Sequence, residues 1–215
     1  METNPFKKLE QFFAQFRLLS YKKGEMILRA DDAPQGVYYL KEGYVRAFSV
    51  SHTGEDLTLI IFKPQDFFPI LWGIVQQQSP YYIEATTSVE VFRAPKEAFI
   101  EFLRENPDVL FVVTQRITIR FGGLLKRMEY LVFGNAYTKT ASIFLILAER
   151  LGEKKGTGVS IPVPLTHREI ASLIGITRET ASVEIKKLEK KNLVLRHGRF
   201  FTVKHVADLT KESLL

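Results

Sequence analysis

The chain has 215 residues, of which 46% are hydrophobic and 25% are charged, a length and composition typical of a two-domain globular protein. Because it contains no cysteine, disulfides, thiolate zinc sites and cysteine-held iron–sulfur clusters are excluded. It has no uninterrupted apolar run of about 18 residues and no basic start followed by an apolar stretch, so we expect a cytoplasmic protein with no membrane partner.

The first half is predicted to begin with a helix and to continue as a small β barrel. Apolar residues at helical spacing predict a short amphipathic helix over residues 6–16. Short β-rich runs separated by turn residues follow, as in an antiparallel barrel or jelly roll. The expected strands cover residues 25–29, 36–41, 44–49, 57–62, 81–86 and 89–93.

The pattern becomes helical after Pro95, with a short helix over 96–104 and a long one that begins at Pro107. Apolar residues in the long helix recur in steps of three and four, and form one seam: Leu110, Val113, Ile117, Phe121, Leu124, Met128 and Leu131. This seam can pack against the barrel, against a second copy of the chain, or against both, and we expect a homodimer. Gly122-Gly123 within the helix would be a kink or a point where two helices approach closely.

Phe133-Gly134-Asn135 breaks the helical pattern and is the expected domain boundary. Residues 1–133 would form a β barrel with its dimerisation helix (about 107–133), and residues 134–215 a second domain. The second domain is predicted to contain a helix over 138–151, a flexible charged loop over 152–158 and a strand over 159–163.

The positive charge of the chain is concentrated in residues 165–204. This segment contains nine Lys or Arg and four Asp or Glu, which gives +5 of the total net charge of +6. A local basic excess is typical of a protein that binds a polyanion, although a solvated basic face would have the same charge.

Two helices and a hairpin are predicted in this basic segment. Thr166 and Glu169 form a capping box, Gly175 ends the first helix in a left-handed conformation, and Thr177 caps a second helix that runs to about Lys191. The second helix has an apolar side made of Ala181, Ile185 and Leu188. Residues 193–204 alternate as two strands around His197-Gly198 and would form a basic wing.

This order of elements predicts a winged helix-turn-helix that binds double-stranded DNA, because a helical hairpin held by packing alone would need neither the wing nor the local charge. The residues expected to read bases are Arg178, Glu179, Ser182 and Val183. The residues expected to contact phosphates are Thr166, Thr177, Lys186, Lys187, Arg196 and Arg199.

The sequence resembles the family of the cyclic-AMP receptor protein and the fumarate-nitrate reduction regulator (CRP/FNR). In the C-terminal part the resemblance rests on Leu165-Thr166, Glu169-Ile170, Gly175, Thr177-Arg178-Glu179-Thr180, Lys186, Leu188-Glu189, Asn192-Leu193 and His197-Gly198. In the N-terminal part it rests on Tyr21-Lys22-Lys23-Gly24-Glu25, Tyr39-Leu40-Lys41-Glu42-Gly43 and Asp66-Phe67. The resemblance implies an α+β fold in which residues 1–133 form a cyclic-nucleotide-binding-like jelly roll that senses an effector, together with a long dimerisation helix. It also implies a C-terminal winged helix-turn-helix that enters the major groove at each half of a palindrome.

Position by position, Arg178 and Glu179 match the base-reading Arg and Glu of the family, and Ser182 matches a base-contacting Ser in one branch. Val183 stands where the family often has a base-reading Arg. This departure predicts a half-site that differs from the common one.

The sequence also departs from the family at the cyclic-nucleotide site. Nucleotide-binding members have a Gly-Glu-Leu turn and an Arg-Ser pair, where this chain has Phe68-Pro69-Ile70-Leu71 and Ser79-Pro80. A buried cyclic phosphate would lack its partners, so we do not expect cyclic AMP to bind. In the aromatic segment 67–82, an apolar small-molecule effector would be lined by Phe68, Trp72, Tyr81 and Tyr82, or these side chains would fill the space themselves.

No cofactor is expected. Haem is disfavoured because His52, the one histidine of the barrel half, lies in the turn Ser51–Asp56. By analogy with the family, this acidic turn would contact RNA polymerase. The alternative function is a small-molecule or cyclic-nucleotide sensor that acts through protein contacts rather than DNA. An enzyme on a cupin-like barrel would need a His/Glu metal set, which the strands lack.

Overall fold

The computed structural model describes residues 4–75 and 79–215, whose contacts divide the chain into two compact units. The first unit comprises Met1–Ser49 and Leu59–Phe121, and the second comprises Val50–Thr58 and Gly122–Leu215. Among the described residues, no helix is both long enough and apolar enough to cross a membrane.

Two four-stranded sheets form the β roll of the N-terminal half. The strand order of one sheet is β1 (Arg17–Tyr21), β8 (Val89–Ala94), β3 (Val37–Glu42) and β6 (Phe67–Phe68). The order of the other is β2 (Met26–Leu28), β7 (Tyr82–Ala85), β4 (Val45–Val50) and β5 (Asp56–Phe62). Apolar side chains from both sheets, such as Leu40 and Ala85, form one buried cluster, which confirms the predicted jelly-roll architecture.

All six strands predicted for the barrel are present, each with bounds within two residues of the expectation. Three further elements of the N-terminal half were not predicted from the sequence: β1, β6 and the short helix α2 (Ile70–Val75). Every residue of β1 is exposed or half-buried, and the strand lacks a clear alternation of apolar and polar residues. β6 has only two residues. The sequence therefore did not predict β1, which lacks the periodicity of a strand, or β6, which is too short to recognise.

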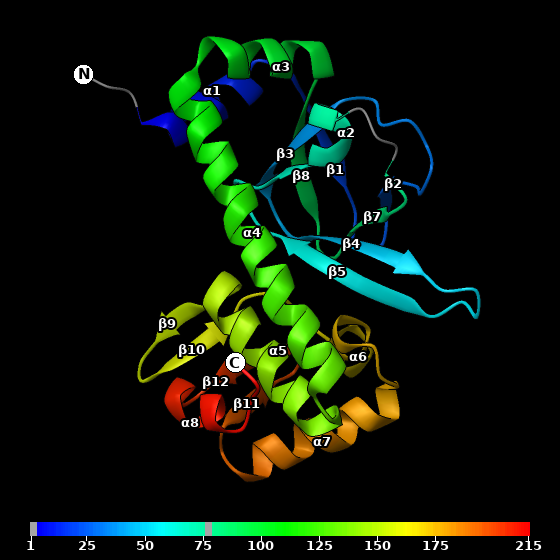
Figure 1. The fold of residues 1–215 in the computed structure, drawn as a ribbon, viewed down its shortest axis with the longest axis vertical. Coiled ribbons are helices and arrows are strands. Elements are labelled where there is room, and N and C mark those ends of the chain that lie inside the picture. The colour runs from blue at the N-terminus through cyan, green and yellow to red at the C-terminus, as the bar shows by residue number, and fades with distance from the viewer. Residues whose placement is uncertain (1–3, 76–78) are drawn as a thin grey trace. The chain divides into compact units, whose positions relative to one another are not determined.

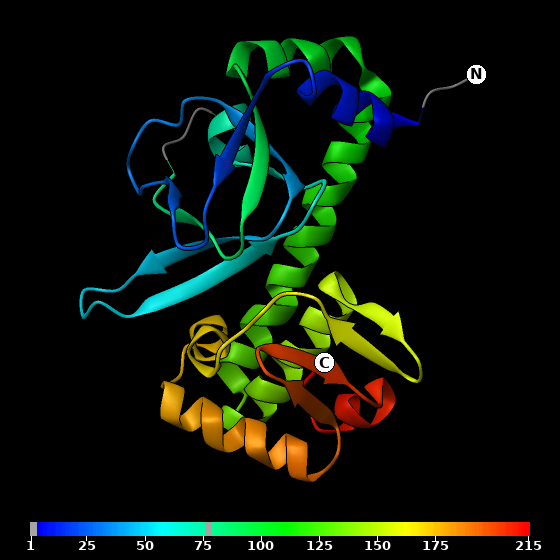
Figure 2. The same ribbon diagram turned by 180° about the vertical axis from the view of Figure 1, so that it is seen from behind.

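The helices α1 (Pro5–Phe13) and α3 (Lys96–Glu105) lie side by side at one end of the roll (Figures 1 and 2). Their contact is aromatic: the Phe12 and Phe102 rings are stacked with centroids 4.2 Å apart. Phe99 is also fully buried in this cluster. The aromatic residues of both helices thus close one end of the roll.

The long helix α4 (Pro107–Phe133) begins and ends where the sequence predicts. Its apolar residues do not form a single seam, however, because Val113 is fully buried together with Val109 in the core of the first unit. Leu131 is half-buried, and the other five predicted seam residues are exposed. One turn of the predicted dimer seam is thus packed in the core of the barrel and is not available to a second copy.

The second unit contains the C-terminal elements. Its helices are α5 (Ala136–Leu151), α6 (His167–Ile174), α7 (Arg178–Lys190) and α8 (Val206–Lys211). Its sheet has the strand order β11 (Val194–His197), β12 (Phe200–Val203), β10 (Gly158–Ile161) and β9 (Glu153–Lys155).

The predicted flexible loop over 152–158 is wrong in part. β9 pairs antiparallel with β10, and the two are joined by a tight turn at Gly156, whose φ of +62° suits glycine. All three side chains of β9 are exposed at the edge of the sheet, so this strand contains no apolar residue. For that reason its Lys-rich sequence indicated a loop.

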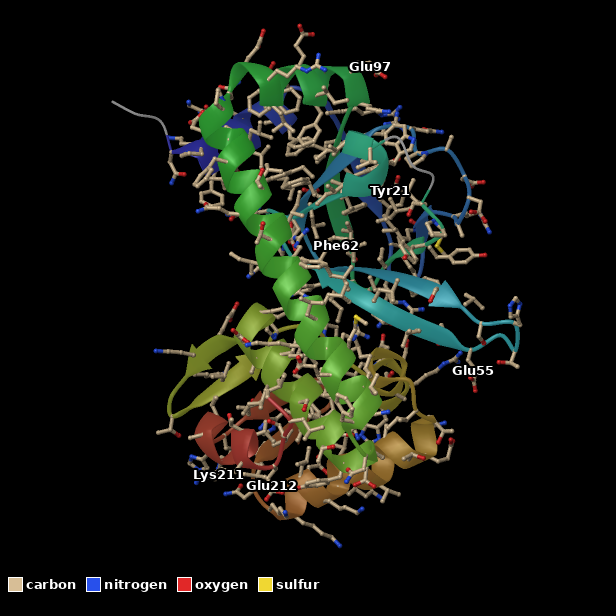
Figure 3. The ribbon with its side chains drawn as sticks, viewed as in Figure 1. Tyr21, Glu55, Phe62, Glu97, Lys211 and Glu212 are labelled. Atoms are coloured by element: carbon tan, nitrogen blue, oxygen red, sulfur yellow. The ribbon has the colours of Figure 1, made fainter. Side chains whose placement is uncertain are left out.

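The end of the chain is fastened to α5 and to the end of α7. Glu212, labelled in Figure 3 beside Lys211, accepts a hydrogen bond from the Tyr137 hydroxyl at 2.9 Å and pairs with the Lys191 ammonium at 2.7 Å. These contacts hold Lys191 against the end of α8. The sequence indicated neither the contacts nor the helix.

Candidate DNA-binding interface

The first helix of the motif, α6, begins and ends as the sequence predicts. The Thr166 side chain accepts a hydrogen bond from the Glu169 N–H at 3.2 Å, and the Glu169 carboxylate accepts one from the Thr166 N–H at 2.5 Å. Gly175 ends the helix with φ +64° and ψ +45°, the left-handed conformation that favours glycine. These local interactions set the position at which the next helix starts.

The second helix, α7, is capped by Thr177, whose side chain accepts a hydrogen bond from the Thr180 N–H at 3.2 Å. Ala181, Ile185 and Leu188 are fully buried, as expected for the side of the helix that packs against its own domain. Both views of the ribbon show α7 at the outside of the second unit (Figures 1 and 2). One side of α7 is therefore free to meet a partner.

The predicted base-reading residues lie on the outer side of α7. Arg178 and Glu179 are exposed in its first turn, and Val183 is 52% exposed one turn later. Ser182 is half-buried, and its hydroxyl donates a hydrogen bond to the Arg178 carbonyl oxygen at 2.9 Å. Three of the four side chains thus face solvent, while the fourth is already engaged within the protein.

Glu184 is a residue of α7 to which the sequence assigned no role. It is buried, and its carboxylate pairs with the Lys187 ammonium at 2.9 Å. Lys187 remains exposed, as does Lys186. Of these two predicted phosphate contacts, Lys187 is therefore partly neutralised by a neighbour on its own helix.

The wing is the hairpin of β11 and β12, which pair antiparallel from Val194↔Val203 to His197↔Phe200. Its turn is at Gly198-Arg199, one residue later than predicted. Arg196 and Arg199 are both exposed. The hairpin therefore presents two guanidinium groups close to its tip.

His167 is a residue of this surface that was not predicted from the sequence. It is the first residue of α6, and its ring nitrogens lie within hydrogen-bond distance of Ser182 in α7 and Arg196 in the wing. A histidine just after a capping threonine gave no signal in the sequence, because both of its partners are distant along the chain.

Two of the predicted effector residues, Phe68 and Trp72, belong to different apolar clusters. Phe68 is fully buried between the sheets and stacks on Tyr38 with centroids 5.6 Å apart. Trp72 packs instead against the cluster at the α1–α3 end of the roll. Phe68 therefore helps to fill the interior of the roll.

Tyr81 and Tyr82 are half-buried, and Tyr82 stacks on Phe48 with centroids 5.3 Å apart. Residues 76–78, which belong to the same predicted segment, lie outside the described residues. Surface hollows of about 280 and 320 Å³ are lined by other side chains.

His52 is exposed in the turn between β4 and β5, the turn in which Figure 3 labels Glu55. Within residues 4–75 and 79–215, no group of three or more His, Asp or Glu side chains is arranged to hold a metal ion.

Two family models match the chain. The cyclic nucleotide-binding domain matches residues 18–106, and the Crp-like helix-turn-helix domain matches residues 138–212. Together they cover most of the sequence.

Curated relatives match over nearly their full length. A global nitrogen regulator from Nostoc sp. is 26% identical over 195 residues, which cover 90% of this chain and 87% of that protein. A cAMP-activated global transcriptional regulator CRP from Escherichia coli O157:H7 is 24% identical over 204 residues, with 94% and 95% covered.

Solved structures share the fold. A CooA mutant from Carboxydothermus hydrogenoformans superimposes with a TM-score of 0.79 at 22% identity, covering 98% of this chain and 96% of that one. FixK2 from Bradyrhizobium japonicum also gives 0.79, at 19% identity, with 93% and 98% covered. With its β roll, its long helix and its winged helix-turn-helix in this order, the chain belongs to the CRP/FNR family of transcription regulators.

Proposed function

We propose that this protein is a homodimeric regulator that recognises a palindromic DNA site, with α7 of each protomer in the major groove. The observation that carries this proposal is the division of α7 into two sides. Ala181, Ile185 and Leu188 are fully buried, whereas Arg178 and Glu179 in the first turn are exposed. A helix fixed by one side and presenting short polar and basic groups on the other suits a groove.

Each exposed residue of α7 suits a different part of a base pair. Arg178 can donate two hydrogen bonds to O6 and N7 of guanine, and Glu179 can accept one from N4 of cytosine. Val183 can contact only an apolar group such as the thymine methyl. Family members with Arg at the position of Val183 can contact a guanine there. This protein should lack that guanine contact in its half-site.

Phosphate contacts position the helix in the groove. The N–H groups at the N-termini of α6 and α7, near Thr166 and Thr177, suit phosphate oxygens, and so do the exposed side chains of Lys186 and Arg199. These contacts add affinity for any duplex, and they make binding salt-dependent.

The second copy of the chain is proposed to cover the exposed apolar side of α4. Phe121, Leu124 and Met128 are 59%, 48% and 54% exposed on successive turns of this helix. A Cβ added to Gly122 or Gly123 would meet no atom within 4 Å, so both glycines are open to a close approach by another helix. Two such helices packed together would place two copies of α7 on one duplex.

The β roll is proposed to have lost the binding of cyclic nucleotides. Ser79-Pro80 stands where an Arg-Ser pair would hold the phosphate, and Ser79 is buried, with its carbonyl oxygen accepting the Asp31 N–H at 3.1 Å. The roll would then respond to another small molecule or serve as a scaffold, without haem, an iron–sulfur cluster or enzymatic activity. The exposed turn at Ser51–Asp56 is the proposed contact with RNA polymerase, in the cytoplasm where the DNA is found.

Duplex binding at several salt concentrations tests this proposal against a sensor that acts only through protein contacts. The wild-type protein should bind DNA with an affinity that falls steeply as salt rises. Arg178→Ala and Glu179→Ala should each reduce discrimination between sites about 5- to 150-fold. Lys186→Ala is the matched control, because it should weaken binding to all duplexes equally. Unchanged sequence preference in both variants would contradict the proposed base contacts.

A further inference from the structure

His167 lies between the recognition helix and the wing. Its Nδ1 is 2.7 Å from the Ser182 hydroxyl oxygen, and its Nε2 is 3.1 Å from Nη1 of Arg196. Arg196 is also fixed on its other side, where its Nε donates to the Gly198 carbonyl oxygen at 2.8 Å. One imidazole ring therefore connects α7 to the tip of the hairpin.

The chemistry of the two partners allows only one form of the ring. A guanidinium group has donors and no acceptor, so Nε2 of His167 must accept the hydrogen bond from Arg196. The single ring proton is then on Nδ1 and is donated to Ser182. The Ser182 hydroxyl proton remains available for the Arg178 carbonyl oxygen, to which it donates at 2.9 Å. All three hydrogen bonds are satisfied at once by the neutral Nδ1–H tautomer.

The surroundings of the ring favour this neutral form. Partial burial lowers the pKa of His167, and the positive charge of Arg196 lowers it further. The centroid of the buried Phe201 ring in β12 lies 6.5 Å from that of the imidazole. The other charged groups that act on the ring all belong to α7: Arg178 and Lys186, which disfavour the imidazolium, and Glu189, which favours it.

We propose that neutral His167 is a positioning residue that links the wing to the recognition helix, so that wing contacts with the DNA backbone and base reading by α7 are energetically coupled. This inference rests on the proposed function. The link fixes the Arg196 side chain, and the Ser182 hydroxyl makes its hydrogen bonds within the protein. Ser182 would then contribute to recognition by holding the ring, with no proton left to donate to a base.

Acid should open this link. A proton on Nε2 would face the guanidinium group of Arg196, so the hydrogen bond would be lost and two positive charges would repel each other. The affinity for the palindromic duplex should then fall relative to that for a scrambled duplex as the pH drops through the pKa of His167. If His167 contacted a phosphate directly, its protonation would instead strengthen binding to both duplexes.

Two substitutions separate the halves of the link. In His167→Gln, the amide oxygen can reach the place of Nε2 and accept from Arg196. In His167→Asn, the shorter amide can donate only to Ser182. His205→Asn is the matched control, because it replaces an exposed histidine outside the interface.

Binding of these variants to the palindromic and scrambled duplexes at pH 8 and pH 5.5 is the DNA test. At pH 8, His167→Asn and Arg196→Ala should each weaken specific binding about fivefold or more, and the double variant should be no weaker than Arg196→Ala alone. His167→Gln, which keeps only the contact with Arg196, should weaken specific binding less than His167→Asn does, and it should lose the pH dependence. Additive losses, or a wild-type affinity for both duplexes that rises in acid, would overturn the coupling.

Imidazole ¹⁵N NMR of the free wild-type protein tests the link without DNA. The expected result is an Nδ1–H tautomer for His167 and a higher pKa of this residue in Arg196→Ala. An Nε2–H tautomer, or an unchanged pKa in that variant, would overturn the link. If the wild-type protein bound no duplex at all, the proposed function would fail, and the NMR result would still decide whether His167 makes the two contacts.

Discussion

Thr58 and Ser172 are joined by two buried hydrogen bonds although 114 residues separate them in the chain. The Thr58 N–H donates to the Ser172 hydroxyl oxygen at 2.9 Å, and the two hydroxyl oxygens are 2.8 Å apart. The Arg127 guanidinium also donates to the Thr58 carbonyl oxygen at 2.6 Å. Within the second unit, the start of β5 is thereby fastened to α6, the first helix of the DNA-binding motif.

Ser172→Ala should destabilise the second unit by about 1–3 kcal/mol, because the Thr58 N–H would be left buried without its acceptor. Thr58→Val is the matched variant, since it removes the hydroxyl and keeps the backbone hydrogen bond. It should cost less than Ser172→Ala. Urea denaturation measures both, and equal stability of Ser172→Ala and the wild-type protein would show that the contact contributes nothing.

Tyr39 should make the stability of the first unit depend on pH in the alkaline range. Burial raises the pKa of Tyr39 to about 12, and the negative charge of Glu10 adds to this effect. The unfolded chain loses the phenol proton near pH 10, whereas the folded protein retains it up to about pH 12. The stability that this group contributes is therefore complete below pH 10 and is lost as the pH rises towards 12.

Denaturation of the wild-type protein and of Tyr39→Phe between pH 8.5 and 11.5 checks this prediction. The variant should lose stability less steeply above pH 10 than the wild-type protein does. The same slope in both proteins would mean that the Tyr39 phenol ionises as readily in the folded state as in the unfolded chain.

The two sides of α7 should respond differently to truncation. Ile185→Ala removes a fully buried side chain and should lower the free energy of unfolding by about 2–5 kcal/mol. Val183→Ala removes a 52% exposed side chain and should change it by less than about 0.5 kcal/mol. Val183→Ala should nevertheless weaken the preference for thymine at one position of the half-site, measured by competition between duplexes. A large loss of stability in Val183→Ala would show that this side of α7 is not free.

An aspartate on the exposed side of α4 should separate the proposed dimer. Leu124→Asp would place an unpaired carboxylate between two apolar helices, and should raise the dimer dissociation constant more than about 100-fold. Lys126→Asp is the control, because Lys126 is exposed but lies off the apolar stripe. Sedimentation equilibrium measures both, and a wild-type protein that is monomeric at micromolar concentration would contradict the proposed assembly.

Local signals predicted the DNA-binding motif well. The capping box at Thr166, the left-handed Gly175 and the cap at Thr177 depend on residues at most three positions apart, so the sequence alone was sufficient. The buried side of α7 follows from its periodicity. The wing turn was displaced by one residue, because Gly198 and Arg199 suit a hairpin turn as well as His197 and Gly198 do.

Distant contacts could not be predicted in the same way. Val113 has the spacing of an exposed seam, and only the packing of α4 on the barrel shows that it is buried. His167 gave no signal because Ser182 and Arg196 are 15 and 29 residues away. The predicted effector residues were grouped by sequence proximity, whereas the sheets place Phe68 and Trp72 in different clusters.

Selection of bound duplexes from a random pool tests the central claim most directly. The wild-type protein should enrich an inverted repeat whose half-sites lie about one helical turn apart. In Arg178→Ala, the preference should relax at one symmetric pair of positions and remain elsewhere. A pool that shows no enriched sequence, or an enriched sequence unchanged by Arg178→Ala, would contradict recognition of a palindrome by α7.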